Sequence, residues 1–167
     1  MRPDVVIEPV RGNVDTRLRK LDDGQYDAIV LAAAGLHRLG HASRITEYLS
    51  QDFMLPAVGQ GALAIETRTD DSVIDEVIHV LDHEASRLAC LAERAFLKGL
   101  GGGCLVPIAA HATIEADVMT LSGMVASPDG TEVVRDRRSA PSSDADLLGR
   151  ELANALLARG AARILSS

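Results

Sequence analysis

The chain has 167 residues, of which 47% are hydrophobic and 25% are charged, and its formal net charge is -7. This composition is typical of a globular protein with one core or two small ones. Only 2% of the residues are aromatic and there is no Trp, so a base-stacking surface is not expected, and the negative charge argues against nucleic acid as a partner.

The first 50 residues alternate extended and helical patterns. Residues 5–8 and 27–32 are apolar runs typical of strands buried on both faces of a sheet. Asn13 is suited to cap a helix that Gly24 would end. The helical patterns span residues 14–23, 33–39 and 43–49. We therefore expect an incomplete, parallel-type βα layer, an α/β arrangement.

The middle of the chain is predicted to contain one extended segment followed by two helices. Residues 57–67 have an extended pattern, with glycines near its start. Amphipathic helices are expected over 72–81 and 84–98, and they are separated near Asp82 and His83.

The last 60 residues predict a compact α+β domain. Three strands are expected, and the turn signals between them lie at 115–117 and 128–130. The strands span residues 107–114, 118–127 and 132–138. Ser143 is expected to cap a final helix that Gly160 ends, with four leucines on its inner face. These leucines are Leu147, Leu148, Leu152 and Leu156. Three antiparallel strands with flanking helices form an α+β fold.

Two cysteines, Cys90 and Cys104, do not make a disulfide framework, and no apolar stretch suits a membrane span or a secretory signal. We therefore expect a cytoplasmic protein without a membrane partner. Cys90 lies within a helical apolar pattern, which indicates core packing and no functional role.

Cys104 stands at the end of the glycine run in GLGGGCLVP, residues 99–107. Glycines adopt positive φ and let the backbone approach a ligand, so the run both ends the preceding helix and presents the thiol on a short loop. The alternative is a helix cap followed by a small buried residue, because free Cys is usually inert packing.

Several blocks of the sequence resemble the porphobilinogen deaminase (hydroxymethylbilane synthase) family and occur in the family's order. They are RGNVDTR at 11–17, YDAIVLAAAGLHRL at 26–39, LPAVGQGA at 55–62, and ERA at 93–95 with GGCLVP at 102–107. The resemblance covers essentially the whole chain. It implies that Cys104 holds a dipyrromethane cofactor through a thioether.

The resemblance also implies hydroxymethylbilane synthesis. Porphobilinogen units would lose ammonia in turn and extend the primer on Cys104, and hydrolysis would release the linear tetrapyrrole of heme biosynthesis. Family chains are nearly twice as long, so we expect this chain to lack the N-terminal half, including the catalytic aspartate, and to be inactive alone. Residues 1–55 then correspond to part of the second domain, 56–83 to a segment returning to the absent first domain plus a hinge, and 84–167 to the third domain.

A carboxylate-binding site is expected at the start of the first helix. Arg11 and Arg17 flank the helix N-terminus, where free N–H groups favour anions, although two solvated arginines would have the same spacing. The resemblance favours ligand binding, because porphobilinogen and oligopyrroles carry acetate and propionate groups that pair with guanidinium. It adds Arg38, Asn13 and Gln60 as further substrate contacts.

Other readings of the sequence remain open. The pairs His37/His41 and His79/His83 have helical spacing, but no third ligand follows, so no metal site is expected and solvated surface histidines are favoured. The chain would otherwise be a non-catalytic anion-binding or regulatory module. A thiol enzyme is a third reading, for which no histidine is placed as a base. Self-association through residues 55–67 is expected if the orphan segments are ordered.

Overall fold

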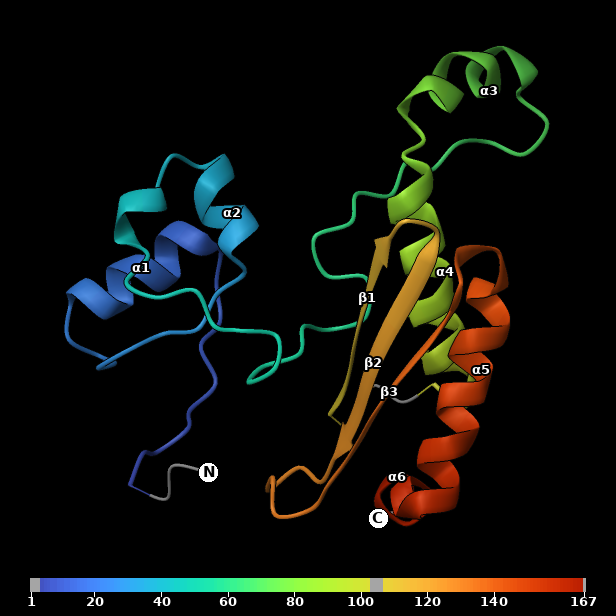
Figure 1. Ribbon diagram of the computed structural model, residues 1–167. Coiled ribbons are helices and arrows are strands. Elements are labelled where there is room, and N and C mark those ends of the chain that lie inside the picture. The colour runs from blue at the N-terminus through green and yellow to red at the C-terminus, as the bar shows by residue number, and fades with distance from the viewer. Residues whose placement is uncertain (1–3, 103–106, 167) are drawn as a thin grey trace. The chain divides into compact units, whose positions relative to one another are not determined.

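The computed structural model describes residues 4–102 and 107–166 (Figure 1). The chain forms two compact units, residues 1–48 and residues 49–167. Each unit is considered by itself.

The first unit is built from short helices around a small apolar contact. Helix α1 (Val14–Asp22) begins where the Asn13 side chain accepts a hydrogen bond from the amide of Thr16, as predicted, and helix α2 (Ala33–Arg38) follows. A 3₁₀ turn, η1 (Ala42–Arg44), completes the unit. Its buried apolar side chains are Leu18 and Leu36.

Surface contacts connect the helices of this unit. The Arg44 guanidinium donates to both carboxylate oxygens of Asp22, at 2.5 and 3.3 Å. His41 Nε2 lies 3.0 Å from Asp15 Oδ1, and Tyr48 Oη lies 2.8 Å from His37 Nε2 with the two rings stacked. These contacts join residues 41–48 to the helices α1 and α2.

The predicted βα layer is wrong for this unit. Residues 5–8 and 27–32 form no strand, and residues 43–49 form only the end of η1 instead of a helix. A strand buried in a parallel sheet needs a neighbour on each side, and no such neighbour lies within residues 4–102. Without pairing, Val6 and Ile7 are almost fully exposed.

The second unit contains a three-stranded antiparallel sheet in the order β1-β2-β3. The strands are β1 (Ile108–Glu115), β2 (Val118–Ala126) and β3 (Val133–Pro141), which confirms the three predicted strands. The pairing register places Ala110 opposite Gly123, and Gly123 opposite Asp136. The β1–β2 turn has positive φ at both Ala116 and Asp117, as a tight two-residue hairpin requires.

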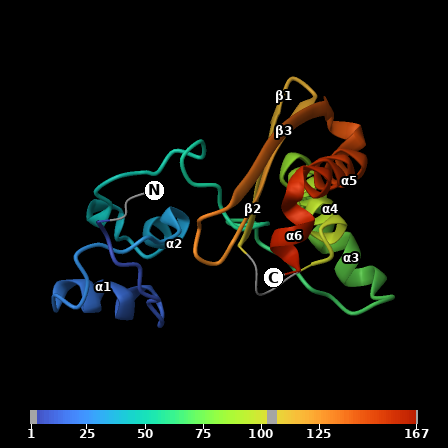
Figure 2. The same cartoon turned by 90° about the horizontal axis from the view of Figure 1, so that it is seen from below.

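Helices cover one face of this sheet (Figure 2). The long helix α4 (Glu84–Gly99) and helix α5 (Ala145–Leu156) pack against each other and against the strands. The chain ends in a π-type turn, η4 (Leu157–Ala161), and helix α6 (Ala162–Leu165). The largest fully buried side chains of the core come from α4, β2 and α5; they are Phe96, Met119, Leu121, Leu148, Leu152, Leu156 and Val125.

Two shorter helical segments precede α4. They are α3 (Ser72–Ile78) and the 3₁₀ turn η2 (His79–Leu81), in agreement with the helix predicted over 72–81. The predicted break at Asp82–His83 is confirmed, because the His83 side chain accepts a hydrogen bond from the Ser86 amide and caps α4.

Three details of the second unit differ from expectation. Residues 57–67 contain a turn and no paired strand. Ser143 does not cap the last long helix, because η3 (Ser142–Asp144) precedes α5 and Asp144 is the cap residue. Leu147 is half-exposed, whereas the other three predicted leucines are buried. Gly160, with φ 108°, interrupts the helical run as predicted.

Candidate functional site

The glycine run ends α4 as the sequence predicts. The Gly102 amide donates to the Leu97 carbonyl at 3.1 Å, and the Gly101 amide donates to the Lys98 carbonyl at 3.0 Å. Gly101 has φ 91°, so this is the Schellman arrangement that needs a residue without Cβ. The cofactor cysteine of the prediction, Cys104, lies outside the described residues.

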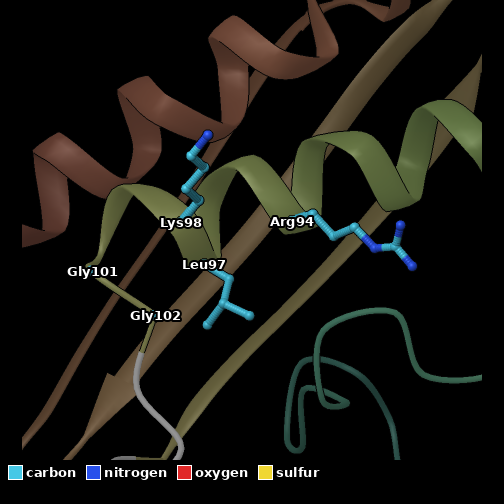
Figure 3. Close-up of a pocket in the computed structure, with 5 residues that line it drawn as sticks. All are labelled: Arg94, Leu97, Lys98, Gly101 and Gly102. Atoms are coloured by element: carbon cyan, nitrogen blue, oxygen red, sulfur yellow. The ribbon is translucent and has the colours of Figure 1, made fainter.

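An open pocket of about 320 Å³ lies beside this helix end (Figure 3). Its lining residues are Arg94, Leu97, Lys98, Gly101 and Gly102. Arg94 and Lys98 point away from one another in Figure 3, and neither forms an ion pair with another described residue. The last turn before residue 103 therefore has a positive surface, which also suits the negative end of the helix dipole.

Three of the predicted ligand-binding residues meet at the start of α1. Arg17 Nε donates to the Gly12 carbonyl at 2.8 Å, so the guanidinium is folded back toward the helix N-terminus. Arg11 is exposed, and its carbonyl accepts from Lys20 Nζ at 3.2 Å. The side-chain oxygen Oδ1 of Asn13 accepts the hydrogen bond that caps the helix, so the side-chain NH₂ group of Asn13 can bind other partners. The start of α1 thus carries two of the predicted cations, Arg11 and Arg17, and their binding of a ligand stays a prediction.

Gly12 is required for this arrangement. Its φ is 126°, and a Cβ there would lie 2.8 Å from Thr16 Cγ2. A residue with a Cβ would therefore be strained at this position, and the Thr16 side chain in the first turn of α1 would have to shift.

The two remaining predicted contacts lie in different units. Arg38 is exposed in the last turn of α2, within residues 1–48. In the same unit, Gly35 of α2 lies against Val14 of α1, so the two helices are in contact. Gln60 is exposed on a turn of the unit formed by residues 49–167.

The four histidines of the two helically spaced pairs make local contacts. His37 and His41 contact Tyr48 and Asp15, His83 caps α4, and His79 Nδ1 lies 2.7 Å from the Glu76 carbonyl oxygen. Within the described residues, no three His, Cys, Asp or Glu side chains gather as metal ligands do. His37, His79 and His83 are exposed and His41 is partly exposed, in agreement with the surface histidines that the sequence favours, and each of the four has a hydrogen-bond partner.

Glu93 is a site residue that the sequence reasoning did not single out. Its side chain is 7% exposed, and it accepts hydrogen bonds from the amides of Gly59 (2.7 Å) and Ala112 (2.9 Å). The available signal was its helical spacing, because Glu93 lies four residues after Ala89 and three before Phe96 on the apolar side of α4. A charged residue in such a stripe is almost never buried without partners.

Cys90 is half-buried in α4 with a free thiol. No helix in the parts of the chain that the structure describes is long and apolar enough to cross a membrane.

Two family models match consecutive parts of the chain. Residues 1–76 match the model described as porphobilinogen deaminase, dipyromethane cofactor binding domain, and residues 87–158 match the porphobilinogen deaminase C-terminal domain. The second match includes the sheet, all but the first three residues of α4, and the glycine run. The chain belongs to the porphobilinogen deaminase family.

Curated relatives agree with these matches. The chain is 52% identical to the porphobilinogen deaminase of Trichlorobacter lovleyi, with 98% of this chain and 53% of the relative covered. It is 51% identical to that of Geobacter metallireducens (99% and 52% covered) and 52% identical to that of Synechococcus elongatus (98% and 51% covered). The chain spans about half the length of the curated relatives it matches.

Proposed function

We propose that this chain provides the cofactor-bearing part and a share of the carboxylate-binding surface of a hydroxymethylbilane synthase. The observation that carries the proposal is the identity of about half of all positions to porphobilinogen deaminases over 98% of the chain. In this function four porphobilinogen units are joined in turn, with loss of ammonia, to a dipyrromethane primer held by Cys104.

The described residues fit a ligand that carries many carboxylates. Arg11 and Arg38 are exposed and have no carboxylate partner within residues 4–102 and 107–166, and Arg17 lies at the exposed amides of α1. Dipyrromethane, when bound, would supply the pyrrole carbon to which the first unit is added, and each later unit would be added to the terminal pyrrole of the growing chain. Arg11, Arg17 and Arg38 would bind its acidic side chains, and Asn13 and Gln60 would contribute neutral hydrogen bonds.

The segment of the relatives that this chain does not span completes the proposal. It would supply the catalytic aspartate, which stabilises positive charge that develops on the pyrrole and handles its protons. We place the boundaries of the three parts at residues 1–55, 56–83 and 84–167. The partner of the second part, residues 56–83, would be the N-terminal half of the same enzyme.

The test of this function compares the two cysteines in protein reassembled with the N-terminal half of a relative. Cys104→Ser should abolish activity and the mass increase expected of a dipyrromethane adduct, because only a thiolate forms the thioether. Cys90→Ser should retain both. Equal loss from the two substitutions in folded protein would refute the role of Cys104, and an unmodified thiol in the active parent would refute the cofactor.

A second experiment tests the arginines in the same reassembled protein. Arg11→Leu or Arg17→Leu should lower the rate of chain elongation by about tenfold or more, because a hydrogen bond to a charged group contributes roughly 1.5–3 kcal/mol. Arg19→Leu, an exposed arginine of the same helix, is the control. A lower melting temperature with unchanged activity would contradict the assignment.

A further inference from the structure

The buried carboxylate of Glu93 connects two separate segments of the second unit. Oε1 accepts from the Ala112 amide of β1, and Oε2 accepts from the Gly59 amide, 34 residues earlier in the chain. His111 Nδ1 is 3.8 Å from Oε1, which is beyond hydrogen-bond distance. Each oxygen therefore holds one backbone segment.

The Ala112 contact places Glu93 on the outer edge of the sheet. β1 pairs with β2 on one side only, so part of its backbone N–H groups face away from the sheet. Ala112 N–H is satisfied by Glu93, and Ala110 N–H donates to the Pro56 carbonyl at 3.2 Å. The edge of β1 is thus covered by residues 56–59 and by the carboxylate, as exposed strand edges generally must be.

The segment before the turn is attached to the same unit at several points. Arg135 donates to the carbonyls of Gln51 and Asp52, Arg137 donates to the Asp52 carboxylate at 3.0 Å, and Leu55 is buried. The Glu93–Gly59 bond is the last of these contacts before Gln60.

The turn that carries Gln60 needs such a contact. Gln60 lies between Gly59 (φ 72°) and Gly61 (φ 87°), and its own amide donates to the Ala57 carbonyl at 2.9 Å. Glycines lose more conformational freedom on ordering than any other residue, so a contact from outside the turn helps to stabilise one conformation of a turn that contains two of them. The Glu93 side chain supplies such a contact, because its Oε2 accepts from the Gly59 amide at 2.7 Å.

We propose that Glu93 is a positioning residue that fixes the 57–61 turn, and with it the Gln60 side chain, on the domain that carries residue 104. The two side-chain oxygens are the essential feature, because each of them accepts from one of the two amides. The functional half of this inference rests on the proposed function, in which Gln60 contacts the oligopyrrole.

Amide hydrogen exchange of the chain itself tests the structural half. In Glu93→Gln one oxygen is replaced by an NH₂ donor, and in Glu93→Leu both acceptors are lost. Exchange at Gly59, Ala112 or both should accelerate about tenfold or more, with upfield shifts of their amide proton resonances, while Leu121 in the centre of the sheet keeps its protection. Glu84→Gln, an exposed carboxylate of the same helix, is the matched control. Unchanged exchange at both amides, or an equal rise at Leu121, would overturn the proposal.

A double-mutant cycle in the reassembled enzyme tests the functional half. If Glu93 acts through Gln60, Glu93→Gln should raise KM in the parent but have little further effect in the Gln60→Ala background. Additive effects would show that Glu93 acts only through stability, and they would overturn the positioning role. An inactive reassembled parent would instead refute the proposed function, and the exchange result would be unaffected.

Discussion

At the scale of single residues, the β2–β3 turn is organised around one carboxylate oxygen. Asp129 Oδ1 accepts from the Ser127 hydroxyl at 2.5 Å, from the Thr131 hydroxyl at 2.9 Å and from the Thr131 amide at 3.1 Å. These hydrogen bonds, first that of Ser127, lower the pKa of Asp129 below the ordinary value of an aspartate. The lowered pKa means that the ionised form holds the turn.

Removing the first donor should reverse this effect. In Ser127→Ala the pKa of Asp129, followed by NMR of its carboxyl carbon, should rise toward the ordinary aspartate value. Ser139→Ala, which removes a hydroxyl that pairs with Thr120, should leave it unchanged. Because the folded pKa is the lower one, the stabilisation by Asp129 is present above the unfolded pKa and is lost as the pH falls through the folded pKa. A rise in the Ser139→Ala protein of equal size would contradict the assigned cause.

At the scale of elements, α4 and α5 approach closely because small residues line their contact. A Cβ on Gly149 of α5 would lie 2.3 Å from the Ala92 carbonyl oxygen and 2.7 Å from Ala95 Cβ. Gly99 of α4 similarly lies against Ala153 of α5. These contacts let the two helices share one face of the sheet (Figure 1).

Gly149→Ala should therefore destabilise the second unit although alanine favours helices. Overpacking of this kind costs roughly 1–3 kcal/mol, more than the gain of about 0.5–1 kcal/mol in helix propensity. Gly35→Ala is the control, since the nearest atom to its Cβ would be Val14 Cγ2 at 3.6 Å. Urea unfolding followed by circular dichroism should show a lower free energy of unfolding only for Gly149→Ala. A stabilised Gly149→Ala protein would mean that the helices move apart without cost.

In the second unit the three strands and the helices could be predicted from the sequence, whereas in the first unit the helices α1 and α2 could be predicted but the strands were wrong. The three strands are recognised because alternation and turn signals are local, as at Pro128–Gly130. The strands predicted at 5–8 and 27–32 are wrong because an apolar run indicates only that a segment is buried. Whether that segment forms a strand depends on other strands with which it can pair. At the site, the glycine run and the Arg17 helix start were predicted by local chemistry. Glu93 was missed because its amide partners are 34 and 19 residues distant.

The β1–β2 hairpin offers a stabilising change at the same scale. Ala116 has φ 44°, in the left-handed region that costs a residue with Cβ roughly 1–2 kcal/mol. Asn tolerates this region, so Ala116→Asn should raise the free energy of unfolding by about 0.5–1 kcal/mol. Ala162→Asn, at an ordinary helical position, should lower it by a few tenths, roughly as helix propensity requires. Denaturant unfolding of both variants tests this prediction. A change in the free energy of unfolding with the same sign in both variants would refute it.

At the scale of the whole molecule, burial is concentrated in the second unit. Within the described part of residues 1–48, the buried apolar side chains are Leu18 and Leu36, whereas the sheet, α4 and α5 share a continuous core. Large apolar side chains remain exposed outside that core, among them Val6, Ile7 and Leu63 at 85–89% exposure. Exposed apolar side chains on unpaired backbone favour association with another chain.

Hydrogen exchange across the whole chain should show this asymmetry. We expect strong protection to be confined to residues 84–102 and 107–160 in dilute protein, because the paired strands and the packed helices α4 and α5 shield the backbone there. Raising the concentration should produce a larger species in sedimentation and add protection within residues 55–67, and Leu63→Asp should abolish both effects. Val118→Asp, at a half-exposed position of the sheet, should abolish neither. Equal protection across residues 1–67 in a monomer would show instead that the first unit is stable without a partner.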